Sequence, residues 1–198
     1  QLNRLSKRRR RSVIKAQPLS EIPKIRSKDK SCQIQPILSS QVKMIQTIVA
    51  VGQRVPGWAQ QAWDDYAHRF PSDWRIDLKV VKTEPRASRT IDQIQALEAV
   101  RIEQAIPKGA LRVSLDERGE RWSTLELSRR MSQWQMEGLN LTWIIGGPDG
   151  LSPALRPPGV LAVRLSDMTL PHQLVRVMLI EQLYRAWSLL NNHPYHRA

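Results

Sequence analysis

The chain has 198 residues, 41% of them hydrophobic, which is enough for the core of one domain of ordinary size and too little for two large ones. Its 31 Lys and Arg outnumber its 18 Asp and Glu, and the resulting net charge of +13 first suggests a nucleic-acid partner. No uncharged apolar stretch reaches about 18 residues and no signal-peptide pattern is visible, which argues against a membrane-spanning helix.

The basic excess is concentrated in residues 1–43. They hold 12 basic and 2 acidic residues, a net of +10, whereas residues 44–198 hold the other 19 basic and 16 acidic residues, a net of +3. The run SKRRRRS, scattered Pro and the lack of a helical or strand period leave too little apolar surface to offset the entropy of ordering. We therefore expect a disordered basic extension over 1–43 and a single domain over 44–198.

Three interpretations of this extension stay open: an RNA-binding arm that displaces counterions from phosphates, upstream sequence joined by a misplaced start site, or an organelle transit peptide. Pro18 and Pro23 argue against the transit peptide because they interrupt any amphipathic helix. The only cysteine, Cys32, also lies here, so residues 44–198 can form neither a disulfide nor a cysteine metal site. We expect a reducing, cytoplasmic setting and no bound metal.

Strand and helix patterns alternate from the start of the domain. Residues 44–52 form an apolar run that ends in Gly, residues 57–70 place apolar side chains near helical spacing, and residues 74–81 alternate with period two. The charged connector TEPRASRT then leads to a second helix over 91–106, which Pro107 ends.

The second half of the domain continues the alternation. A short strand at 110–116 precedes a helix that Ser123 or Thr124 caps and Gly138 ends. The remaining predicted elements are, in order, strands at 139–145 and 159–166 and a long helix after Pro171. This order indicates an α/β domain with a mostly parallel sheet and helices on both faces, whose ligands bind beyond the carboxyl ends of the strands.

Three segments at predicted strand ends are candidates for a binding site: SLDERG (114–119), IIGGPDGLSP (144–153) and RLSDMTLPH (164–172). Gly146 and Gly147 let backbone N–H groups approach a ligand because no Cβ intervenes. The glycines fit neither GxGxxG nor GxxxxGK[ST], which argues against a phosphate loop and against a dinucleotide-dependent oxidoreductase. Taken singly, each segment is explained equally well as a turn or a helix cap.

Taken together and in order, the segments LDERG, IGGPDGLSP, LSDMTLPHQLVRV, EQLYRAW and NHPYHR resemble the ribosomal RNA large subunit methyltransferase H family of the SPOUT superfamily. The resemblance spans residues 44–198 and leaves out the extension. It implies an α/β fold with a deep trefoil knot near the C-terminus, and a homodimer. The implied reaction moves a methyl group from S-adenosylmethionine to N3 of a pseudouridine in large-subunit (23S) ribosomal RNA. This RNA is then the expected partner, within the assembled ribosome.

The resemblance also assigns site residues. The cofactor would contact one residue in each of the first two segments and a continuous run in the third: Leu115, Gly146, Leu165, Ser166, Asp167, Met168, Thr169 and Leu170. At Asp167 the backbone is expected to matter more than the carboxylate. These loops supply mainly backbone groups and apolar side chains, which suit an adenine and a methionine held in a bent form.

Methyl transfer from a sulfonium requires alignment of the reacting atoms and removal of the imide proton, and it needs no metal. The polar candidates for catalysis are His172, Arg176, Tyr195, His196 and Arg197. A neutral His at a helix N-terminus can accept a proton, whereas an Arg would stabilise the nucleobase anion. The sequence does not choose between these two, and the resemblance implies that the tail folds over the cofactor site.

Two expectations concern partners. The helix after Pro171 is apolar on too much of its circumference for one buried stripe, which favours packing on its own sheet and against a second subunit. The basic residues expected to contact RNA are Arg86, Arg89, Arg118, Arg121, Arg176 and Arg197. The competing function is a noncatalytic RNA-binding or ribosome-associated module that keeps the knotted fold, and binding of S-adenosylmethionine discriminates the two.

Overall fold

The computed structural model describes residues 43–157 and 159–197, without the side chain of Arg197. The predictions for the basic extension, Lys43 apart, lie outside the described residues. The strands are β1 (Met44–Val51), β2 (Trp74–Val81), β3 (Leu111–Arg121), β4 (Leu141–Ile145) and β5 (Leu161–Arg164). The helices are α1 (Gly57–Ala67), α2 (Ile91–Ala105), α3 (Thr124–Met136) and α4 (His172–Leu190), with short 3-10 helices η2 (Pro153–Leu155) and η3 (Pro194–Arg197).

The five strands form one sheet in the order β2-β1-β4-β3-β5, and every neighbouring pair is parallel. The prediction of a mostly parallel sheet is therefore confirmed. The register aligns Ala50, Ile145, Leu115 and Val163 in one row across β1, β4, β3 and β5. Because the strands run in the same direction, the segments that follow this row leave the sheet at the same edge.

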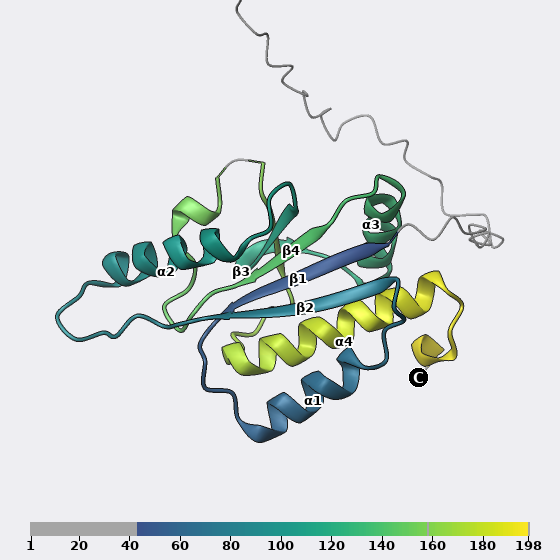
Figure 1. Ribbon diagram of the computed structural model, residues 1–198, viewed down its shortest axis with the longest axis horizontal. Coiled ribbons are helices and arrows are strands. Elements are labelled where there is room, and N and C mark those ends of the chain that lie inside the picture. Colours follow the sequence, from purple (N-terminus) through teal and green to yellow (C-terminus); the bar gives the residue numbers. More distant parts are fainter. Residues whose placement is uncertain (1–42, 158, 198) are drawn as a thin grey trace, which may run out of the picture. The chain divides into compact units, whose positions relative to one another are not determined.

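Helices cover both faces of the sheet, as predicted. Figure 1 shows α2 on one side of the strands and α1 and α4 on the other. The adjacent β1 residues Ile48 and Val49 point to opposite faces, as period two requires, and belong to different core clusters. Ile48 packs in the cluster that contains Leu183 of α4, whereas Val49 packs in the cluster that contains Ile102 of α2.

Two helices begin with the local signals that their sequences carry. Ser123 caps α3, with its side chain accepting from the backbone N–H of Glu126 and the Glu126 carboxylate accepting from the backbone N–H of Ser123. Thr90 and Gln93 make the same reciprocal contact at the start of α2. Such capping boxes satisfy backbone donors that the first helical turn leaves free.

The third strand is longer than predicted. Its pairing with β4 ends at Leu115, next to the predicted end at Asp116, but the chain rejoins β5 at Glu120 after a shift in register. Val163 therefore pairs with β3 on both sides of the excursion at 116–119. The charged residues of this excursion interrupt the apolar alternation, so the sequence pattern concealed the continuation of the strand.

Candidate functional site

The three predicted strand-end segments meet in one pocket of about 720 Å³. This volume lies within the range of about 300–1,000 Å³ that is usual for small-molecule sites. The wall is formed mainly by these segments and completed by α2, the segment after η2, and the start of α4: residues 115–118, 145–151, Val163, Arg164, Leu165, Ser166, Met168, Thr169, Leu170, Pro171, Gln95, Arg156, His172 and Val175. Glycines, apolar residues and charged residues thus line one cavity.

Of the residues predicted to contact the cofactor, all but one line this pocket: Leu115, Gly146, Leu165, Ser166, Met168, Thr169 and Leu170. Asp167 is the exception. Its carboxylate lies 3.0 Å from Arg121 and 3.3 Å from Arg164 in ion pairs. The structure therefore brings the three segments together, while the contact of each residue with a cofactor stays a prediction.

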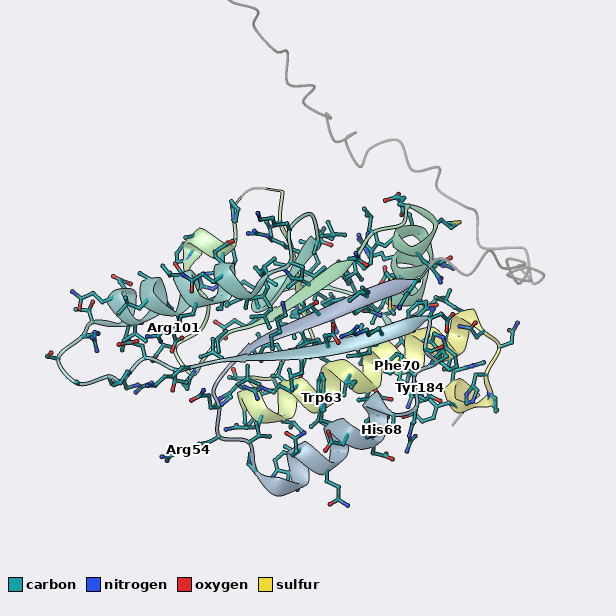
Figure 2. All side chains as sticks on the ribbon, in the orientation of Figure 1. Arg54, Trp63, His68, Phe70, Arg101 and Tyr184 are labelled. Atoms are coloured by element: carbon teal, nitrogen blue, oxygen red, sulfur yellow. The ribbon has the colours of Figure 1, made fainter. Side chains whose placement is uncertain are left out.

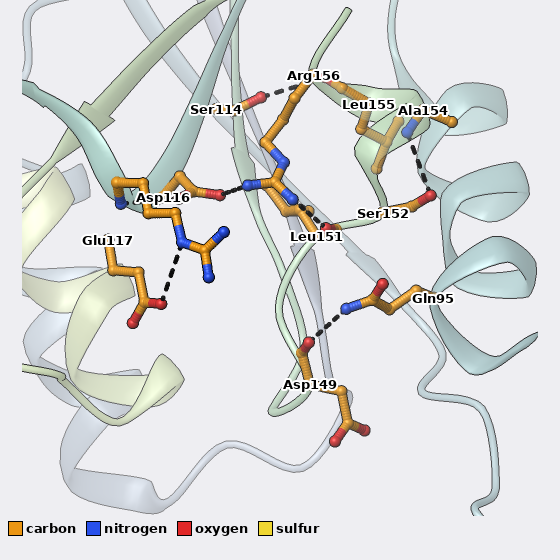
Figure 3. A network of polar contacts seen from close by, with 11 residues as sticks. Gln95, Ser114, Asp116, Glu117, Asp149, Leu151, Ser152, Ala154, Leu155 and Arg156 are labelled. Carbon is orange, nitrogen blue, oxygen red and sulfur yellow. Dashed lines mark hydrogen bonds and ion pairs between the residues drawn. The ribbon is translucent and has the colours of Figure 1, made fainter. Parts of the chain in front are cut away.

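The glycine-rich loop after β4 is held from outside the loop. Within it, the backbone N–H of Gly150 donates to the carbonyl of Gly147 over 3.0 Å and closes a tight turn. From α2, Nε2 of Gln95 donates to the carbonyl of Asp149 over 2.6 Å, as Figure 3 shows. From the β2–α2 connector, Nη2 of Arg86 lies 2.7 Å from the Asp149 carboxylate. These contacts tie the pocket wall to α2 and its connector.

A buried carboxylate of α2 packs behind the same loop. Glu98 is 4% exposed, and a Cβ added at Gly147 would lie 2.9 Å from its Oε2, so only glycine fits there without movement. Glu98 accepts the backbone N–H of Glu84 over 3.0 Å. The neighbouring arginines Arg89 and Arg101 form their ion pairs with Glu84. Burial raises the pKa of Glu98 above the usual value for glutamate.

An arginine joins two walls of the pocket. Arg156 forms an ion pair with Asp116 at the end of the β3–β4 pairing, and its Nη2 donates to the carbonyl of Leu151 over 3.1 Å. The other oxygen of Asp116 accepts the backbone N–H of Arg118 over 2.8 Å. Figure 3 shows Arg156 lying between Asp116 and Leu151. The segments after β3 and β4 are therefore braced against each other by one side chain.

Two of the predicted catalytic residues lie at the first turns of α4. His172 lines the pocket, and burial, followed by the charge of Arg176, lowers the pKa of His172 below its usual value. Arg176 is 3% exposed, and its Nη2 donates to the carbonyls of Val51 and Gly52 over 2.7 and 2.6 Å. The prediction that Arg176 contacts RNA at the surface is wrong, because its guanidinium is buried at the end of β1.

The other three predicted catalytic residues, Tyr195, His196 and Arg197, belong to η3. The hydroxyls of Tyr195 and Tyr66 lie 3.0 Å apart, and Tyr195 donates to the carboxylate of Glu181 over 3.1 Å. Its ring packs edge-on against Tyr184 with centroids 4.9 Å apart. Figure 2 shows Tyr184 beside Phe70, near the end of α1. Burial raises the pKa of Tyr195 far above its usual value, so its hydroxyl stays protonated.

Within one chain, the predicted catalytic residues therefore form two separate groups. Tyr184, on which the tail packs, lies about 18 Å along the α4 axis from His172 at the helical rise of about 1.5 Å per residue. Neither Tyr195 nor His196 lines the pocket. The tail of this chain therefore does not fold over the pocket of the same chain.

Three residues that support the pocket from outside were not predicted from the sequence: Gln95, Glu98 and Arg156. Glu98 did carry a signal, because it lies four residues from both Ile94 and Ile102 on the buried stripe of α2. An acidic residue on an apolar stripe is rarely without a partner. Gln95 and Arg156 carried no such local signal, since Asp149, which Gln95 contacts, and Asp116, which pairs with Arg156, are distant in the sequence.

Among the described residues, no group of three or more His, Cys, Asp or Glu is placed to hold a metal ion. In the same part of the chain, no helix is long and apolar enough to cross a membrane.

Comparisons with known proteins give the family. The family model described as a predicted SPOUT methyltransferase matches residues 44–196. Ribosomal RNA large subunit methyltransferase H of Albidiferax ferrireducens is 59% identical over 150 residues, which are 76% of this chain and 97% of that protein. The protein of the same name from Verminephrobacter eiseniae is 60% identical over the same shares.

A solved structure, of a probable methylase family protein from Haemophilus influenzae Rd KW20, matches with 13% identity and a TM-score of 0.49 over 77% of this chain and 69% of that chain. A likeness this distant carries no argument about the site. The family model and the two relatives suffice: the chain belongs to the SPOUT methyltransferases, in the family of ribosomal RNA large subunit methyltransferase H.

Proposed function

We propose that this chain is an S-adenosylmethionine-dependent methyltransferase that methylates N3 of a pseudouridine in large-subunit ribosomal RNA. The observation that carries the proposal is the meeting of three strand-end segments in one pocket of about 720 Å³. The chain in which they meet is 59% identical to a protein named ribosomal RNA large subunit methyltransferase H. Family membership supports the choice of reaction, and the pocket supplies a place for it.

The pocket fits the cofactor in size and in chemistry. Apolar walls from Leu115, Ile145 and Leu170 suit a nucleobase and the aliphatic part of a methionine. When bound, S-adenosylmethionine supplies an electrophilic methyl group on a sulfonium. The residues proposed to hold it are Leu115, Gly146, Leu165, Ser166, Asp167 through its backbone, Met168, Thr169 and Leu170.

We assign the acceptance of the imide proton to His172. It lines the pocket, and the lowered pKa leaves its ring neutral, hence able to accept a proton, at neutral pH. Tyr195 is a poor base because its hydroxyl is protonated and already donates to Glu181. Arg176 does not line the pocket, so a direct role in stabilising the nucleobase anion is not supported.

The position of the tail supports a site that two copies of the chain share. Since η3 packs near the far end of α4, it cannot contact the pocket that His172 lines in the same chain. We propose a homodimer in which the tail of one chain reaches the pocket of the other and supplies His196 and Arg197 to the RNA. The trefoil knot near the C-terminus is likewise proposed, and family membership supports it.

Calorimetric titration with S-adenosylmethionine tests the proposal against the noncatalytic module. We expect about one binding site per chain. Arg156→Met should weaken binding roughly tenfold, because a charge-assisted contact of about 1.5–3 kcal/mol that braces the pocket is lost. The control Arg112→Met removes an ion pair with Glu103 and no residue of the pocket, so it should bind as the unsubstituted chain does. Absence of binding to the unsubstituted chain would leave only the RNA-binding module.

A further inference from the structure

Arg176 is the only buried Lys or Arg in the part of the chain that the structure describes. Nη2 donates to two main-chain carbonyls, but Nε and Nη1 have no hydrogen-bond partner among the described residues. No ion pair joins Arg176 to a carboxylate within those residues. Burying a cation with incomplete pairing is unfavourable, so a purely structural role would be served better by an apolar side chain.

The Arg176 guanidinium contacts main-chain carbonyls and does not face the pocket. Arg176 is absent from the residues that line the pocket, whereas His172 and Val175 of the same helix line it. The carbonyls that Nη2 contacts belong to Val51, the last residue of β1, and to Gly52. Arg176 therefore ties the end of β1 to the first turns of α4.

This tie brings the end of β1 against His172. Gly52 has a φ of +107°, and a Cβ added there would lie 3.4 Å from both Nη2 of Arg176 and Nε2 of His172. The backbone at this point thus contacts both side chains, and the positive φ favours glycine. His172 and Arg176 are four residues apart, so they lie on the same side of α4. We call Gly52, His172 and Arg176 the β1-end cluster.

We propose that Arg176 is a positioning residue, which holds the end of β1 against His172 and, through its charge, keeps the His172 ring neutral and oriented into the pocket. The inference rests on the proposed function, since it matters only if His172 accepts a proton there. The retained charge explains why an arginine is buried with two of its nitrogens unpaired. Two like charges one helical turn apart disfavour each other, so Arg176 opposes protonation of His172.

The other charged groups around His172 are accounted for. Among the segments packed against it, 165–171 carries Asp167, which pairs with Arg121 and Arg164. The segment after β1 carries Arg54, which points away from the domain in Figure 2. The carboxylates that line the same pocket each form an ion pair with an arginine: Asp116 with Arg156, Glu117 with Arg118, and Asp149 with Arg86. Arg176 is the charge that acts on the pKa of His172.

The test is an NMR titration of the histidine rings in the full chain, without cofactor or RNA. His172→Gln assigns the signal among the four histidines. In the unsubstituted chain we expect His172 to titrate below the ordinary value of about 6.5. Arg176→Gln keeps a donor for the carbonyls but removes the charge, so the pKa of His172 should rise above that in the unsubstituted chain. Arg176→Lys keeps the charge and should leave the pKa of His172 low.

Activity gives a second readout. The acid limb of the pH profile of kcat should move to higher pH in Arg176→Gln, because a ring that holds its proton more tightly is neutral only at higher pH. Arg176→Lys should not move it. Arg75→Gln is the matched control, since Arg75 lies on β2 in an exposed ion pair with Asp77 and should change neither titration nor profile.

Three results would overturn the inference. One is a folded Arg176→Gln chain in which His172 titrates as in the unsubstituted chain, and another is an equal shift in Arg176→Gln and Arg176→Lys. The third, which needs no variant at position 176, is a His172 that titrates at or above about 6.5 in the unsubstituted chain. A different outcome is possible if the His172 pKa behaves as expected in all three chains but His172→Gln still transfers methyl groups fully. That outcome would refute the role proposed for His172 and leave its electrostatic coupling to Arg176 in place.

Discussion

Two carboxylates beside the pocket, the partly buried Asp116 and the buried Glu98, differ in how their charge is balanced. Asp116 forms an ion pair with Arg156 and accepts a backbone N–H from Arg118. Glu98 accepts one backbone N–H, and among the described residues its ion-pairing neighbours are bound to Glu84 instead. Desolvation therefore prevails at Glu98 and raises the pKa of its carboxyl group.

The raised pKa makes a prediction about pH and stability. Because the folded chain holds the Glu98 proton more tightly than the unfolded chain, this residue contributes stability below the unfolded pKa of about 4.3, and the contribution is lost as pH rises through the folded pKa. Glu98→Gln removes this loss while keeping an acceptor for Glu84. Its free energy of unfolding, measured in urea, should therefore rise relative to the unsubstituted chain as pH increases from about 4 to about 8.

The control for this prediction is Glu103→Gln, on the same helix. The Glu103 side chain is 42% exposed and pairs with Arg112, so its substitution should give no such increase with pH. A stability difference between Glu98→Gln and the unsubstituted chain that stays constant across this pH range would contradict the assignment.

At the scale of elements, α2 serves as the outer support of the glycine-rich loop after β4. Gln95 bonds to the loop backbone and Glu98 fills the space beside Gly147. The connector before α2 contributes Arg86, which was expected to contact RNA and which pairs with Asp149 of the loop. Arg86 therefore holds the pocket wall through this ion pair.

Gly147→Ala tests this support. The added Cβ would lie 2.9 Å from Oε2 of Glu98 and 3.1 Å from Cγ1 of Val51, so either the loop or the buried Glu98 carboxylate must shift. We expect a stability loss of about 1–3 kcal/mol in chemical unfolding and weaker cofactor binding. The matched control is Gly57→Ala, where nothing lies within 4 Å of the added Cβ and no loss is expected. Equal behaviour of the two variants would show that the loop is not held against α2.

Sequence patterns predicted the strands and helices better than the side-chain contacts that hold the pocket loops in place. All five strands and four helices were expected in the right order, because apolar runs punctuated by Gly, Pro and capping residues are local signals. The continuation of β3 after Leu115 was missed, since Asp116 and Glu117 interrupt its alternation. The contacts of Gln95 with Asp149 and of Arg156 with Asp116 could not be predicted, because only the fold brings these residues together.

At the scale of the whole molecule, α4 connects the two halves of the proposed active site. The helix carries apolar side chains around most of its circumference, and every residue from 172 to 190 is at least partly buried. One end presents His172 to the pocket, and the other end carries the aromatic cluster that anchors Tyr195. A single chain therefore cannot join these ends, which is the physical argument for the proposed homodimer.

Mixing two inactive variants tests the shared site. A chain truncated after Asn192 keeps its pocket but lacks the tail, and His172→Ala keeps the tail but lacks the proposed base. Each should be inactive alone, and random mixing of two-fold dimers should restore about a quarter of the normal number of complete sites. Mixed dimers, verified by tagged pull-down, that show no methyl transfer would refute the shared site.

The measurement that tests the central claim most directly is mass mapping of large-subunit ribosomal RNA. Assembled large subunits from cells that lack this protein are incubated with the purified chain and S-adenosylmethionine. The account predicts the gain of one methyl group, at N3 of a single pseudouridine. No gain in mass, or a methyl group on a different kind of nucleotide, would contradict it.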